Sequence, residues 1–278
     1  MALSTVRDVD FIVARIHAHH ASMVEGGRLD EMCRIRTVPE LARRLWDDAT
    51  PTMTSAEFQR RVVAEYAAEI DKLALSVPEG VRLFFEMLKE GKRALAHQSL
   101  EADTAAATKY YAELISRARN CAPPNGRPAY EIAAQSASIF LGMLALRLVF
   151  NYAMKPALVG KYYFDGTFIS RQVFDGIVAA SELQPALDLC SSAIAGGVPC
   201  RTIPELEAAA WDRYLMLAHR LWRSDPIGVG AIIGYVGIRR IEIANLVTLS
   251  EGLRLGVESR RLRSYLIPHQ PLKETHHA

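Results

Sequence analysis

The chain has 278 residues, of which half are hydrophobic, and a formal net charge of +2. This balance is typical of a globular protein and lacks the excess of positive charge with which nucleic-acid-binding proteins attract phosphates. The four cysteines are scattered and contain no C-x-x-C pair, so a zinc ribbon or a redox pair is not expected. Without a disulfide pattern or a secretory segment, we expect a reducing, cytosolic location and no nucleic-acid partner.

Helical patterns follow one another along the first half of the chain. Apolar residues recur with a period near 3.6 over residues 6–23, which predicts a helix. Thr37 and Thr54 each precede a glutamate by three residues, the spacing of a capping box, so we expect helices to begin there. Further helices are expected over residues 78–97 and 101–119.

The second half has the same character. The proline-rich residues 120–128 predict a loop, and long apolar helices are expected over residues 130–154 and 228–256. The β-prone residues 162–164 are followed at once by an Asp-Gly pair, which favours a turn over a strand. The sequence therefore predicts an all-α fold without a substantial β-sheet.

Two apolar stretches require a comparison with membrane spans. Residues 137–146 and 226–238 are each bounded by arginine and are far shorter than the roughly twenty apolar residues that a spanning helix needs. Both are therefore expected to be buried helices. The protein is predicted not to cross a membrane, although it can still bind to the surface of one.

The chain also shows signs of internal repetition. Residues 36–41 (RTVPEL) recur as residues 201–206 (RTIPEL), which is explained either by a true repeat or by shared capping chemistry. More broadly, runs of shorter helices end three times in a long apolar one, at residues 78–97, 130–154 and 228–256. Such organisation favours stacked or ring-like helical units.

The sequence gives only weak evidence for a metal-binding or catalytic site. His17, His19 and His20 lack the i, i+4 spacing of helical metal ligands, and a solvated helix face is the favoured interpretation. Glu25 and its acidic neighbours Asp30 and Glu31 lie in a polar turn with nothing in the sequence to raise a pKa. No phosphate-binding loop and no arrangement of nucleophile, base and orienting group can be assembled, so neither a catalytic residue, nor a metal, nor a cofactor is predicted.

Two surface features have a structural and a functional interpretation. The glycines at 230, 234 and 237 form a row of small residues that allows another backbone to approach, and packing within the chain is favoured over a partner. Arg254, Arg260, Arg261 and Arg263 form a basic cluster near the C-terminus. It is more readily explained as a cationic helix end that complements the macrodipole than as a phosphate site.

The most informative residues are Glu242 and Asn245. They are three residues apart in an apolar helical stretch and so share one helix face. A buried carboxylate and a buried amide are costly unless each has a partner. We therefore expect another helix or another chain to meet this pair.

The motif Glu242-Ile243-x-Asn245-Leu246, preceded by Gly234-Tyr235, resembles the C-terminal signature of one family of rotary-ATPase proteins, the prokaryotic C and eukaryotic d subunits of A-type and V-type ATPases. The stretch Phe11-x-x-Ala14-Arg15-Ile16-x-Ala18 is similar to the opening helix of that family. The resemblance implies a single helical domain, residues 1–278, shaped like a funnel with pseudo-threefold organisation. Its approximate units are residues 6–97, 98–157 and 158–268, with a tail at 269–278.

The resemblance also implies a function. Such a protein is not an enzyme; it lies on the cytoplasmic face of the membrane and links the proteolipid subunits of the rotor ring to the central-shaft subunits. Glu242 and Asn245 are expected to hold the helices of the third unit together, with Arg15 as an internal partner of Glu242.

Departures from the family pattern leave alternatives open. The polar pairs that family members often carry in the earlier long helices correspond here to Phe84 and Met87, and to Ser138 and Leu141. One alternative is a stand-alone helical scaffold or interaction protein derived from the family. Another is a helical enzyme whose site leaves no motif.

Overall fold

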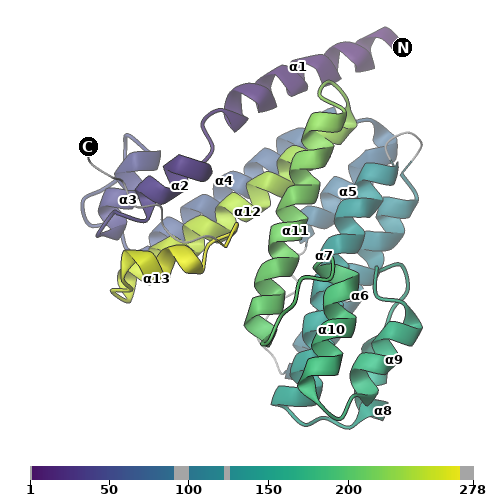
Figure 1. Cartoon of the computed structure of the whole chain (residues 1–278). Helices are drawn as coiled ribbons and strands as arrows, with labels where there is room; N and C mark the ends of the chain where they lie inside the picture. Colours follow the sequence, from purple (N-terminus) through teal and green to yellow (C-terminus); the bar gives the residue numbers. More distant parts are fainter. Residues whose placement is uncertain (1, 91–99, 122–125, 270–278) are drawn as a thin grey trace.

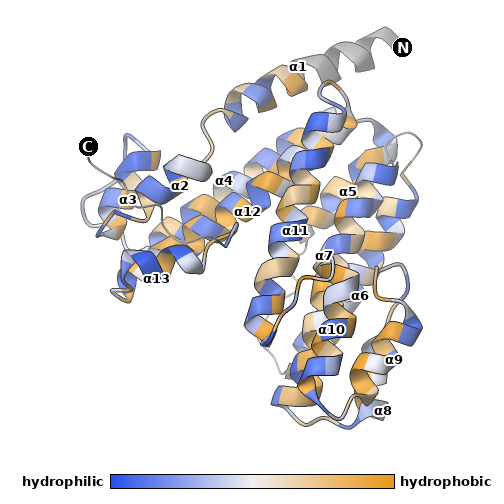
Figure 2. Ribbon diagram, viewed as in Figure 1, coloured by the Kyte–Doolittle hydropathy of each residue, from blue (hydrophilic) through white to orange (hydrophobic). Residues whose placement is uncertain are grey.

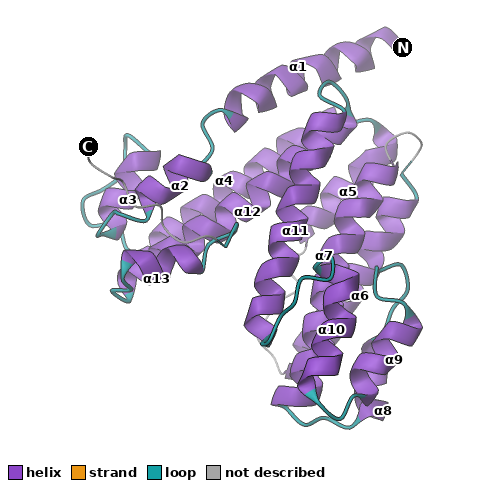
Figure 3. Cartoon of the chain, in the orientation of Figure 1, coloured by secondary structure: helices purple, strands orange, loops and turns teal. Residues whose placement is uncertain are grey.

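The computed structural model describes residues 2–90, 100–121 and 126–269 (Figure 1). Every regular element in these ranges is a helix (Figure 3). The predicted all-α fold is therefore confirmed. Of the predicted tail at 269–278, all but residue 269 lies outside the described residues.

The helices follow the order of the sequence patterns. In the N-terminal part they are α1 (Ala2–His20), α2 (Gly26–Met32), α3 (Val38–Leu45), α4 (Ser55–Ser76) and α5 (Glu79–Glu90). The central part contains α6 (Leu100–Arg119), α7 (Gly126–Leu146), the π-helical η1 (Arg147–Asn151), α8 (Pro156–Val159) and the 3-10 helix η2 (Gly160–Tyr162). The last part contains α9 (Arg171–Ala179), α10 (Leu183–Ile194), α11 (Ile203–Ser224), α12 (Val229–Arg254) and α13 (Ser259–Ser264).

The helices form two arms that meet at an angle (Figure 1). One arm contains α1 to α4 together with α12 and α13, so helices from the first and last parts of the described chain lie in the same arm. The other arm contains α6 to α10. Helix α11 packs along α12 and also contacts α7, and thereby joins the arms.

Helices α7 and α12 are the most deeply buried, and apolar colours dominate both in Figure 2. Helix α12 packs against α11 and α4, with further contacts to α7, α1 and α3. Among the described helices, one stretch, Gly126–Asn151, is long and apolar enough to cross a membrane. Since 78% of its most apolar part is buried within the protein, it has the character of a core helix.

Side-chain caps begin the helices where the sequence predicts them. Thr54 and Glu57 form the full reciprocal capping box at the start of α4. Thr37 and Thr202 cap α3 and α11 by accepting the backbone N–H of the glutamate three residues on, at 3.3 Å in both cases. Each of those glutamates in turn accepts the N–H of the arginine before the threonine. The repeated hexamer thus encodes one capping geometry, on helices of very different length.

The glycine row on α12 lets α11 approach closely. A Cβ atom added to Gly234 would lie 2.5 Å from the backbone nitrogen of Trp222 and 2.7 Å from the backbone oxygen of Ala218. Two backbones therefore touch at this point, and no larger side chain fits between them. The prediction that the row serves packing within the chain is confirmed at this glycine.

Candidate functional site

Asn245, on α12, holds the segment that follows α13. Its side chain is only 4% exposed. The Nδ2 atom donates to the carbonyl oxygen of Ile267 at 2.6 Å, and the Ile267 N–H donates to Oδ1 at 2.9 Å. The carboxamide thus binds a backbone unit as another peptide group would, and both of its buried polar atoms are satisfied.

Glu242, one turn earlier on α12, holds the opposite end of the chain. Its carboxylate, also 4% exposed, accepts the backbone N–H of Val24 at 2.6 Å. Val24 lies in the loop between α1 and α2. The predicted demand for partners is therefore met within the chain, by one segment near each terminus.

Arg239, and not Arg15, neutralises Glu242. Arg239 lies three residues before Glu242 on the same helix and forms a short ion pair with it. Its Nε atom also binds Glu69 of α4 at 3.0 Å. Arg15 is exposed on α1. The expected pairing was wrong because a cation at i−3 on the same helix reaches the carboxylate without help from a neighbouring helix.

The charge on Arg239 is secured by these two carboxylates. Burial disfavours the guanidinium ion, but Glu242 and Glu69 outweigh that cost and raise the pKa of Arg239. Tyr235 adds a short hydrogen bond from its hydroxyl to Glu69. Helices α4 and α12 are consequently joined by a partly buried polar network in addition to apolar contacts.

The histidines near the end of α1 contact α11 and α12. His17 lies 3.0 Å from the carbonyl oxygen of Pro226, and the ring of His20 stacks on Trp222 with 4.7 Å between centroids. His19 Nδ1 is 2.6 Å from the Tyr235 hydroxyl. His17 and His19 stay exposed in part, as expected of a solvated face, but all three rings also attach α1 to the helices beneath it.

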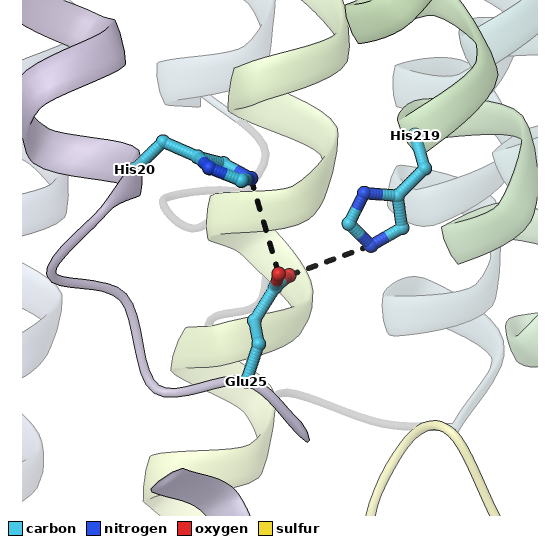
Figure 4. Close-up of side chains that lie close together, drawn as sticks. All are labelled: His20, Glu25 and His219. Carbon is cyan, nitrogen blue, oxygen red and sulfur yellow. Dashed lines mark ion pairs between the residues drawn. The ribbon is translucent and has the colours of Figure 1, made fainter. Parts of the chain in front are cut away.

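Glu25 lies between two imidazoles (Figure 4). Its carboxylate is 3.9 Å from His20 Nε2 and 3.6 Å from His219 Nε2, which comes from α11. Burial, reinforced by the charge of Glu242, raises the pKa of Glu25 to about 7. No pattern in the sequence indicated this contact, because His219 is far along the chain from the turn that contains Glu25.

Several of these polar side chains line one cavity. It has a volume of about 550 Å³ and is lined by apolar side chains together with Glu25, His219, Glu242, Asn245 and Asp212. The cavity thus lies where the α1–α2 loop, α11, α12 and the segment after α13 meet. Sequence spacing pointed to the two residues on α12 but not to the other polar groups.

The arginines of the C-terminal basic cluster differ in burial and in their ion-pair partners. Arg263 is 2% exposed and pairs with Asp30 at 2.7 Å, so it joins α13 to α2 and is not a surface cation. Arg254 is exposed and pairs with Glu251 on its own helix. The interpretation of this cluster as a cationic helix end was therefore wrong for Arg263, since the sequence does not show that α2 packs there.

The position on α7 that the sequence resemblance sets beside Glu242 also binds a backbone amide. Ser138, fully buried on α7, accepts the N–H of Phe168 at 2.7 Å and donates to the carbonyl oxygen of Ala134 at 2.6 Å. On α5, Phe84 and Met87, which the same resemblance sets beside the pair, are buried apolar side chains. Leu141 on α7 is likewise buried.

The chain is thus an all-helical protein whose long central helix α12 carries a buried carboxylate–amide pair. Residues 93–265 match the family described as ATP synthase (C/AC39) subunit, and the chain belongs to this family. The match extends over more than half of the chain and confirms the resemblance seen in the sequence. Helices α1 to α5 lie outside the matched residues. The search of curated proteins found no match.

Proposed function

We propose that the chain is a non-catalytic coupling subunit of a rotary V/A-type ATPase, which links the central shaft to the membrane rotor ring. The observation that carries this proposal is the family match over residues 93–265. The family is one of V/A-type ATPase subunits, and the coupling role is the finer step that we infer for this chain.

The contacts of α12 support a mechanical role. A protein that couples shaft to ring transmits torque, so its helices must not slide or twist against one another. Glu242 and Asn245 tie both ends of the chain to α12, and Arg239 ties α4 to it. Dense packing around a central helix with these polar ties resists deformation.

The position of Ser138 supports a relation between the second and third units. Ser138 and Glu242 each use a buried oxygen on a long central helix to bind the backbone N–H of a segment outside the helices, at Phe168 and Val24. On this basis we infer that the units at 98–157 and 158–268 share an origin. The first unit, 6–97, and the funnel shape are part of the same proposal.

We further infer that the partners are the proteolipid subunits of the ring and the subunits of the shaft. The chain would then bind peripherally on the cytoplasmic face without spanning the membrane. The near-neutral net charge of +2 supports protein partners over nucleic acid.

Purification from native membranes tests the proposal. An affinity-tagged chain is expected to co-purify with the ring and shaft subunits, and deletion of its gene should abolish ATP-driven ion transport in membrane vesicles while the detached head still hydrolyses ATP. Restoration of transport by the wild-type gene is the control.

The scaffold alternative gives the opposite result. A stand-alone scaffold derived from the family would be recovered without ring or shaft subunits, and its deletion would leave ion transport intact. Either outcome would overturn the coupling role.

A further inference from the structure

We propose that His20, Glu25 and His219 form a binding site for one divalent transition-metal ion, with zinc as the best match. The site lies at the edge of the cavity described above and joins the end of α1, the N-cap of α2 and the C-terminal part of α11. All three ligands come from one chain, so the site would form in the isolated protein whether or not it couples a shaft to a ring.

The distances suit a small cation. The three ligand atoms all lie within 4.8 Å of one another, and the Glu25 carboxylate is 3.6 and 3.9 Å from the two imidazole nitrogens. Tetrahedral zinc with ligand bonds near 2.0–2.1 Å holds its donor atoms roughly 3.4 Å apart. Modest side-chain movements would therefore bring the three donors to bonding distance, with the fourth position left for water.

One of the donors lacks a partner. His20 Nε2 is buried and has no hydrogen-bond partner among the described residues. At 3.9 Å, the Glu25 carboxylate toward which it points is too distant for a hydrogen bond. A buried polar atom without a partner is costly and requires an explanation. A metal ion between His20 and Glu25 would give this nitrogen a partner, because the nitrogen would coordinate the ion.

The rings are already held in position. His20 stacks on Trp222 with an angle of 19° between the ring planes, and the His20 and His219 rings are close to perpendicular at 89°. Figure 4 shows the two imidazoles on either side of the Glu25 carboxylate. Ligands fixed in this way lose little rotational freedom on binding, which favours affinity.

The charges around the site do not oppose the binding of a cation. The negative charge of Glu242 acts on both Glu25 and His20. Its ion-pair partner Arg239 is shared with a second carboxylate, that of Glu69. The positive charge of Arg223 acts on His219 from the same helix, but that side chain is exposed and screened by water.

Zinc titration of the purified chain tests the proposal. His276 and His277, close to the C-terminal end of the sequence, could bind zinc independently of the site, so both are first replaced by alanine. In this background, isothermal titration calorimetry is expected to show one zinc ion per chain, and zinc should raise the melting temperature. Absence of saturable binding would overturn the proposal, since the terminal histidines would then account for any zinc taken up by the wild type.

Variants locate the ion. H219N and E25Q should each weaken zinc binding at least tenfold and remove the zinc-dependent rise in melting temperature. H17N, a matched change on α1 outside the site, should leave both unchanged. Circular dichroism checks that each variant is folded. Should H219N not fold, H219Q takes its place, and retention of full affinity in both folded ligand variants would refute the site.

Discussion

Asn245 and Ile267 exchange two hydrogen bonds, of 2.6 and 2.9 Å, between a side-chain amide and a backbone unit. Little water can reach Asn245 to replace these bonds, because the residue is only 4% exposed. The contact fixes the segment after α13 against α12. The stability of the C-terminal segment should therefore depend on this one side chain.

Replacement of Asn245 tests that dependence. N245A leaves the partly buried backbone N–H and carbonyl of Ile267 without their side-chain partner, and should lower the free energy of unfolding by about 1–3 kcal/mol. N245D should also destabilise, because a carboxylate cannot donate to the Ile267 carbonyl oxygen. Urea denaturation measures both, with N120A, at an exposed asparagine, as control. A cost for N245A no larger than that of the control would contradict the proposed tie.

Replacement of Arg239 should destabilise the protein more than replacement of Glu242. R239Q leaves two carboxylates without a cation, and removal of one partner of a buried pair costs about 3–5 kcal/mol. E242Q should cost less, because Arg239 retains Glu69 and the new amide can still accept the Val24 N–H. Thermal and urea unfolding of the single and double variants form a double-mutant cycle.

R15Q is the control for this series. Arg15 is exposed, so its replacement should change the free energy of unfolding by less than about 0.5 kcal/mol. A loss equal to that of R239Q would restore Arg15 as the partner of Glu242.

Glycine-to-alanine changes test the contact between α11 and α12. G234A would force a Cβ into the backbone of Trp222 and Ala218, and overpacking of this kind costs about 1–3 kcal/mol. G27A, in α2, meets no atom within 4 Å and should stabilise by about 0.5–1 kcal/mol, because alanine loses less chain entropy. The melting temperature should therefore fall in G234A and rise in G27A. Equal shifts would show that close packing at Gly234 is not limiting.

The cysteines should be unreactive in the folded protein. All four are buried, and burial raises the pKa of Cys33 to about 11 and that of Cys190 to about 12. At pH 8 the thiolate, which is the nucleophile, is therefore scarce. Alkylation by iodoacetamide, followed by mass spectrometry, should be slow in buffer and fast in urea. Rapid labelling of Cys33 in buffer at pH 8 would argue against its burial.

The same pKa shifts give the direction of the pH effect on stability. The folded-state pKa of Cys33 lies above its ordinary value of about 9, so folding favours the protonated thiol. The stabilisation is complete below pH 9 and is lost as the pH rises toward 11. C33S, which does not titrate in this range, should flatten the decline in melting temperature there.

Local chemistry in the sequence determined the helices and their starts. Threonine caps with glutamate three residues later begin α3, α4 and α11, because the side chains satisfy backbone N–H groups within the same turn. The spacing of Glu242 and Asn245 likewise placed them on one face, and the order of the motifs identified the family. Such features depend only on residues that are close together in the chain.

Tertiary structure alone decided what those residues meet. Spacing shows which side chains share a helix face, but not which distant segment crosses that face. Glu242 meets the backbone of Val24, Asn245 meets Ile267, and His219 meets Glu25. These contacts arise because α11 and α12 pack together beside the α1–α2 loop and the segment after α13, an arrangement fixed by the packing of apolar surfaces and not by any local pattern.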